Sequence, residues 1–179
     1  MDFMKCIKER RSIRKFKPDE VSDILLKQVV EAASYSPSWK NSQSVRYIAI
    51  SDTELKTKIA EECVMDFEYN KKTILRAPML VLITTVSPRS GFERDGSFST
   101  SKGTHWESFD AGIATQTFCL AAHEQGLGTV VLGIYDEDKV IAAAAIQGQK
   151  VSALVAVGFP DEAPAMPKRK DIDELLTIH

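Results

Sequence analysis

The sequence has few features that point to a membrane, a secretory route or a nucleic acid. No apolar run approaches the ~20 residues needed to cross a bilayer. The first residues, MDFMKCIKERR, interleave charges with apolar side chains, unlike a signal peptide. The formal net charge is only -2, so no global basic field favours nucleic acid or anionic lipid. We therefore expect a cytoplasmic protein whose partners include neither a membrane nor a nucleic acid.

Cysteine and histidine are scarce, at three residues each. The cysteines are scattered and lack C-x-x-C spacing, which favours reduced, structural thiols. The histidines lack ligand-like spacing, so we expect no bound metal. A P-loop, an H-E-x-x-H helix and a nucleophile elbow are also missing from the sequence. The segment GLGTVV begins like a dinucleotide fingerprint, but it lacks the third glycine and follows a predicted helix instead of a strand.

What the chain does contain is the pattern of one globular domain, predicted over residues 1–179. At 44% hydrophobic and 27% charged residues, its composition is ordinary for such a domain. Helical periodicity and strand-like apolar runs alternate only in part, and the strands number about four, which favours an α+β fold with a mixed sheet covered by helices. Helices are predicted at 3–10, 23–34, 52–63, 67–75, 109–125 and 135–146, and strands at 45–51, 79–85, 130–132 and 151–159.

The polar stretch from Ser87 to about Glu107 is rich in glycine and serine and carries three aromatic residues. We expect a long loop there, because the stretch lacks the periodicity of a helix or a strand. The loop could be a mobile surface excursion, or a lid that places aromatic side chains over a site. The sequence leaves both alternatives open.

The strongest local feature is a basic cluster, RRSIRKFK, near the start of the chain. Arg10, Arg11, Ser12 and Arg14 supply guanidinium groups, a hydroxyl and loop N–H groups within a few residues. A phosphate needs several donors from different directions, and these residue types match that need. Taken by spacing alone, the cluster fits a solvated charge run equally well.

A family resemblance decides between these alternatives. The segments RRSIRKF, SPSWKNSQ, FDAGIATQTFCLAAHEQGLGT, VVLG and PKRKDIDELL resemble, in order, the motifs of the nitroreductase family of FMN-dependent oxidoreductases. The resemblance covers nearly the whole chain. It implies a mainly antiparallel sheet covered by helices, and a homodimer in which the two chains interleave.

The resemblance also implies roles for particular positions. The FMN phosphate and ribityl chain would be bound by Arg10, Arg11 and Ser12, and the tail residues Lys168 and Arg169 would return to the phosphate. Arg14 would lie near the pyrimidine edge of the flavin, where a cation stabilises the negative charge of the reduced ring.

The remaining implied positions concern the flavin ring. The turn residues that would reach the flavin bound mainly by the other subunit are Pro37, Ser38, Trp39, Asn41 and Gln43. Asn70 would face the ring near N5, while Val131, Leu132 and Gly133 would offer backbone groups and an apolar wall. The chain departs from the family pattern at Trp39, which is larger than usual and is expected to narrow the substrate cleft. It also departs at Ser44 and Val45, where Pro-Trp is common, and at Asp171, where proline is frequent.

Three hypotheses follow for the function. In the first, NADH or NADPH passes a hydride through flavin N5 to a small acceptor, such as a nitroaromatic, a quinone or an activated alkene, by a ping-pong mechanism. In the second, the protein is a flavin- or phosphate-binding carrier or sensor without turnover. In the third, it is a plain anion or nucleic-acid binder, which would be colourless and whose affinity for its ligand would depend strongly on salt. The first requires no strongly acidic or basic side chain, which agrees with the missing catalytic dyad.

Overall fold

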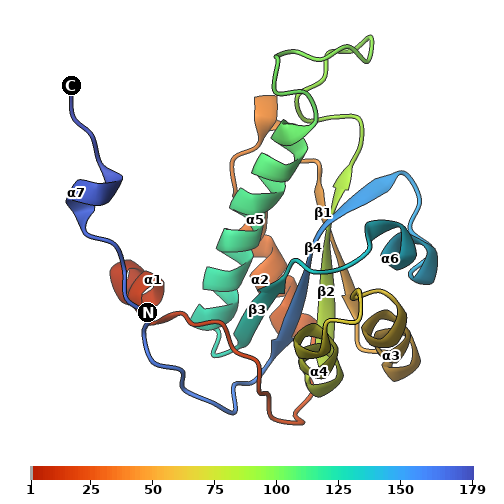
Figure 1. The fold of residues 1–179 in the computed structure, drawn as a ribbon, viewed down its shortest axis with the longest axis vertical. Coiled ribbons are helices and arrows are strands. Elements are labelled where there is room, and N and C mark those ends of the chain that lie inside the picture. The colour runs from red at the N-terminus through yellow and green to blue at the C-terminus, as the bar shows by residue number, and fades with distance from the viewer. Residues whose placement is uncertain (1) are drawn as a thin grey trace.

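The computed structural model describes residues 2–179, so Met1, the first residue of the predicted domain, lies outside the described residues. The centre of the fold is a four-stranded sheet in the order β1-β2-β4-β3 (Figure 1). The strands are β1 (Val45–Ile50), β2 (Met79–Val86), β3 (Gly128–Leu132) and β4 (Gln149–Gly158). All three neighbouring pairs are antiparallel. The predicted α+β class and the count of four strands are confirmed.

Helices cover both faces of this sheet (Figure 1). One face packs against α2 (Asp23–Ser34) and α5 (His105–Glu124), and the other against α3 (Thr53–Glu62), α4 (Glu68–Arg76) and α6 (Glu137–Ala143). The short elements α1 (Phe3–Glu9), η1 (Trp39–Asn41) and α7 (Ile172–Leu175) lie outside these layers. Several helices begin at a side chain that accepts a hydrogen bond from the first turn, namely Asp2, Ser22, Asp52 and Asp136.

The covered sheet explains why the central strand is apolar without interruption. Leu80 and Leu82 of β2 belong to the core on the α3, α4 and α6 side. Val81 and Ile83 alternate with them and belong to the core on the α2 and α5 side. All four side chains are completely buried. Because both faces of β2 are covered, the strand shows a continuous apolar run and no polar alternation.

The structure corrects the predicted bounds of four elements, among them β4, which begins at Gln149 and not at residue 151. Helix α5 begins at His105, not at Phe109, so the preceding loop ends at residue 104. Strand β3 begins at Gly128, two residues before the predicted start. Helix α6 is shorter than the predicted 135–146, because Asp136 caps its start and Ala145 adopts a left-handed φ of 51° just beyond its end. Among residues 2–179, no helix is both long and apolar enough to span a bilayer.

Candidate flavin-binding site

The basic cluster is held against the sheet by two buried side chains. Ile13 and Phe16 point into the core, while the arginines and lysines between and before them stay at the surface. The Ile13 N–H donates to the Thr129 carbonyl of β3 at 2.9 Å, and the Lys17 N–H donates to the Phe159 carbonyl at 2.9 Å. The cluster therefore lies along the edge of the sheet in a fixed backbone conformation.

Gly128 makes this close approach sterically feasible. A Cβ atom built on Gly128 would lie only 2.8 Å from both the Cβ and the Cγ1 of Ile13. Carbon atoms in favourable contact are ~3.5–4.0 Å apart, so any side chain here would push the segment off the strand. Gly128, the first residue of β3, thus allows the basic cluster to pack against the strand.

A cleft of about 270 Å³ opens beside the cluster. Arg10 and Arg11 line it together with His123, Thr129 and Glu162. Burial, the largest cause, lowers the pKa of His123, so the imidazole tends to be neutral. Among residues 2–179, no ion pair engages an arginine of the cluster, and the Ser12 hydroxyl makes no hydrogen bond. These donors are available for a phosphate group.

Two further contacts shape the cluster. The Arg11 guanidinium donates from Nη1 to the carbonyls of Lys8 and Arg10, at 2.6 and 2.8 Å, at the end of α1. The Glu162 carboxylate accepts hydrogen bonds from the Arg14 and Lys15 N–H groups, at 2.6 and 3.2 Å. Glu162 thereby ties the start of the C-terminal tail to the basic cluster.

The predicted tail residues lie further along. The tail leaves the cleft near Pro164 and continues through α7 (Figure 1). Lys168 and Arg169 are exposed, and within residues 2–179 neither forms a hydrogen bond or an ion pair with the cluster. Their predicted return to the phosphate stays a prediction.

The residues predicted to face the flavin ring come together at the far end of β3. Asn70 is buried on α4, and its Nδ2 donates to the Ile134 carbonyl at 2.9 Å, which places it beside Gly133. Val130 and Leu132 point into one core, so Val131 points to the opposite face, where it is 48% exposed. The basic cluster and this apolar wall therefore occupy the two ends of the same edge strand.

The turn that contains Pro37, Ser38, Trp39, Asn41 and Gln43 has a strained backbone. Lys40, Asn41 and Gln43 have φ values of 45°, 54° and 46°, in the left-handed region. Each costs roughly 1–2 kcal/mol for a residue with a Cβ. Such strain persists only where the surroundings fix it, and it concentrates at functional sites. Within the turn, the Gln43 N–H donates to Ser38 Oγ at 2.9 Å, and Arg46 Nη1 donates to the Gln43 carbonyl at 2.7 Å.

The sequence analysis missed Asp110, a buried carboxylate that anchors this turn from α5. Asp110 Oδ2 accepts hydrogen bonds from the Trp39 N–H at 2.9 Å and from the Ser90 hydroxyl at 2.6 Å. The Trp39 and Trp106 rings pack with their centroids 4.6 Å apart. A carboxylate inside an otherwise apolar helix pattern was the available signal, because a buried charge requires partners.

The loop at 87–104 is attached to the same region. Lys40 forms an ion pair with Glu93 at 3.0 Å, and the Lys102 ammonium lies 5.0 Å from the centre of the Trp106 ring. Inside the loop, the Ser99 N–H donates to the Gly91 carbonyl at 2.9 Å. The loop is therefore folded upon itself and joined to the turn.

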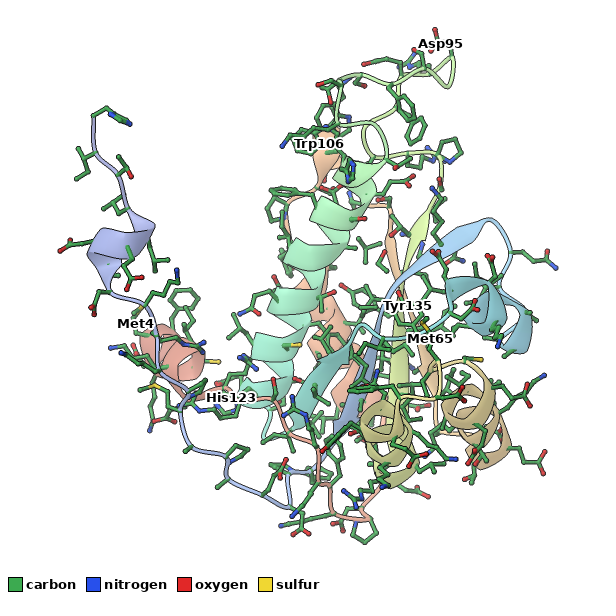
Figure 2. All side chains as sticks on the ribbon, in the orientation of Figure 1. Met4, Met65, Asp95, Trp106, His123 and Tyr135 are labelled. Carbon is green, nitrogen blue, oxygen red and sulfur yellow. The ribbon has the colours of Figure 1, made fainter. Side chains whose placement is uncertain are left out.

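The turn at 37–43 and the basic cluster lie near opposite ends of α5. Figure 2 shows Trp106 at the start of this helix, near the turn, and His123 at its other end, near the basic cluster. At 1.5 Å per residue, Asp110 and His123 are about 20 Å apart along the helix axis. A cleft of about 580 Å³ lined by Ser38, Gln43 and Asp110 opens between α2, β1 and α5, at the turn end.

Known proteins resemble this chain in sequence and in fold. The sequence profile of the Nitroreductase family matches residues 7–159. YfhC of Bacillus subtilis (strain 168), provisionally named an NAD(P)H nitroreductase, is 26% identical over 96% of this chain and 91% of its own length. A nitroreductase family protein of Clostridium novyi NT superposes with a TM-score of 0.78 at 28% identity, over 97% of this chain and 91% of its own. A Desulfovibrio desulfuricans protein, provisionally described as a nitroreductase and solved in complex with FMN, gives 0.78 at 25% identity over 98% and 95%.

Proposed function

Because the chain belongs to the nitroreductase family, we propose that it is an FMN-dependent oxidoreductase that uses NADH or NADPH to reduce a small organic acceptor. The observation that carries the proposal is the set of unpaired donors at the edge of β3. Within residues 2–179, the side-chain donors of Arg10, Arg14 and Ser12 make one long contact, from Arg14 Nη1 to the Ser12 carbonyl at 3.5 Å, and no other. The relatives' names, which include NAD(P)H and FMN, support the same assignment.

Bound FMN would supply the redox chemistry, taking a hydride from the nicotinamide and giving it to the acceptor in a ping-pong sequence. The role of the chain itself would be to bind the FMN and to orient its ring. Arg10, Arg11 and Ser12 would hold the phosphate, with Lys168 and Arg169 added from the tail. Arg14 would place a positive charge near the pyrimidine edge of the ring. Val131 and Gly133 would form the wall against which the ring lies, and Asn70 secures that wall through the Ile134 carbonyl.

We further propose a homodimer in which the turn at 37–43 reaches the flavin held mainly by the partner chain. The separation of about 20 Å between the turn and the basic cluster along α5 supports this arrangement. Large apolar side chains also lie exposed on α1, α5 and the tail, at Phe3, Met4, Phe109, Met166, Ile172, Leu175 and Ile178. Exposed apolar surface on this scale is typical of a protein interface.

Nitroaromatics, quinones and activated alkenes fit the acceptor class, since all three accept a hydride and then a proton. Trp39 supports a restricted choice among them. Its ring packs on Trp106 and is half-buried, so it forms a fixed side of the turn. In a substrate cleft narrowed by the Trp39 ring, a flat, conjugated acceptor would stack better than a bulky aliphatic one.

The experiment is an anaerobic titration of the purified protein with NADH and with NADPH, followed by flavin absorbance. We expect a yellow protein that bleaches within seconds and recovers its colour when a quinone is added. The double variant Arg10→Ala with Arg11→Ala should be purified largely without flavin. Lys58→Ala with Lys139→Ala, which removes two exposed charges from α3 and α6 outside the cleft at the basic cluster, should keep its flavin. A yellow protein that neither nucleotide bleaches would favour a carrier, and unchanged flavin in the double variant would refute the assigned phosphate site.

A further inference from the structure

Asp110 is a buried carboxylate to which the proposed hydride transfer gives no direct role. Its side chain is only 2% exposed, and its buried neighbours on α5 are the apolar Ala111 and Ala114 and a second carboxylate, Glu107. A carboxylate in such surroundings is costly unless its oxygen atoms receive hydrogen bonds. One oxygen atom, Oδ2, receives two, and the donors come from two different segments of the chain.

The two donors are the parts of the site that most need external support. Trp39 N–H belongs to the turn in which Lys40, Asn41 and Gln43 hold left-handed φ values. Ser90 Oγ belongs to the loop at 87–104 and is itself completely buried. Asp110 is therefore the point where α5, a regular helix of twenty residues, meets the strained turn and the loop.

We propose that Asp110 is a positioning residue that fixes the turn at 37–43 and the loop at 87–104 in one arrangement, and that this arrangement sets how Asn41 and Gln43 meet the flavin. The inference rests on the proposed function, in which the turn reaches the flavin of the partner chain. The Trp39–Trp106 packing follows from the same anchor, because the Trp39 backbone and the Ser90 contact to the Trp106 carbonyl, at 3.2 Å, converge on it.

The geometry predicts that the loss of Asp110 lowers the reactivity of the flavin but not its binding. Asp110→Ala leaves the Trp39 N–H without its acceptor and leaves the Ser90 hydroxyl only its longer contact with the Trp106 carbonyl, at 3.2 Å. The left-handed residues of the turn are then free to relax. The basic cluster near the other end of α5, about 20 Å away, keeps its contacts with β3. The variant should therefore retain FMN, while the ring and its substrates meet a displaced turn.

The test uses the flavin-loaded protein and measures the anaerobic rate of flavin reduction, normalised to bound FMN, with the nucleotide that the wild type prefers. We expect Asp110→Ala to bind FMN within twofold of the wild type and to be reduced about 10–100-fold more slowly, as misplacement by about 1 Å produces. Asp110→Asn should recover most of the rate, because one amide oxygen can accept both hydrogen bonds that Oδ2 accepts. The visible circular dichroism of the flavin should change in Asp110→Ala and stay unchanged in Asp110→Asn.

Asp138→Ala, at an exposed acidic position in the first turn of α6, is the matched control and should behave as the wild type. Equal rates per flavin in Asp110→Ala and wild type would overturn the inference, as would an Asp110→Asn rate no better than that of Asp110→Ala. If Asp110→Ala does not fold, Ser90→Ala breaks one of the two hydrogen bonds and should slow reduction several-fold, and an unchanged rate would overturn the inference. A wild type that binds no FMN or is not reduced refutes the proposed function and this inference together. If the wild type binds FMN and turns over, the Asp110 variants test this inference alone.

Discussion

The close contact between Gly128 and Ile13 gives the sharpest prediction about how the basic cluster is held. In Gly128→Ala the new methyl group would lie 2.8 Å from Ile13 Cβ and Cγ1, and 2.9 Å from Cγ2. To reach an ordinary carbon–carbon separation, the segment must move outwards by about 0.7 Å or more. The first contact to suffer is the Ile13 N–H to Thr129 carbonyl hydrogen bond, which is 2.9 Å long.

Both stability and flavin affinity should respond to this displacement. Overpacking a well-packed site costs about 1–3 kcal/mol. For a chain of this size each kcal/mol lowers Tm by roughly 2–4 °C, so we expect a fall of about 2–12 °C in thermal unfolding. Because Arg10 and Ser12 move with Ile13, the Kd for FMN measured by fluorescence quenching should rise about tenfold or more.

Gly126→Ala provides the matched control. Gly126 has a φ of +81°, but a Cβ there would meet no atom within 4 Å. The substitution should therefore cost about 1–2 kcal/mol of backbone strain without moving Ile13. Tm should fall while the Kd for FMN stays unchanged. If Gly128→Ala binds FMN as the wild type does, or if Gly126→Ala weakens binding equally, the steric account of the cluster is wrong.

The remaining predictions concern the flavin and one buried lysine. Arg14→Ala should lower the flavin midpoint potential by roughly 10–30 mV in an anaerobic dye titration, because an exposed cation near a reduced ring contributes only modestly; an unchanged or raised potential would argue against its placement. Lys56→Met should lower the free energy of unfolding by about 1–3 kcal/mol in a urea titration, because the buried Nζ donates to the Ala77 and Pro78 carbonyls at 2.7 and 3.2 Å. Burial, the largest cause, lowers the pKa of Lys56, so between the folded pKa and its ordinary value the unfolded chain binds more protons and wild-type stability rises with pH. The stability advantage of the wild type over Lys56→Met should therefore grow as pH is raised from 7 towards 10, and a constant or shrinking difference would contradict this reasoning.

The sequence predicted the layered architecture well because its signals are local. The continuous apolar run of β2 and the helical periodicity of α2 each depend on a few neighbouring positions. The start of α5 was predicted late, because His105, Trp106 and Glu107 lack an apolar stripe and are held by tertiary contacts. Trp106 packs on Trp39, and Glu107 pairs with Lys150 at 3.1 Å. Such contacts join positions far apart in the sequence.

In the candidate site too, local features could be predicted from the sequence, whereas contacts between distant positions could not. The backbone pairing of Ser12 with Thr129 places the basic cluster on β3, yet nothing in RRSIRKF indicates which strand it meets. Asp110 was missed because its two partners, a backbone N–H of the turn and a serine of the loop, are distant along the chain. The roles taken from the family for Lys168 and Arg169 stay predictions, because these side chains lie exposed on the tail.

The contact between Trp39 and Trp106 also makes the protein its own optical probe. The chain has two tryptophans, and both belong to this single ring pair. Selectively excited indole emission therefore comes from one place in the fold, where the turn meets the start of α5. Time-resolved emission would then report the motion of the turn without any attached dye.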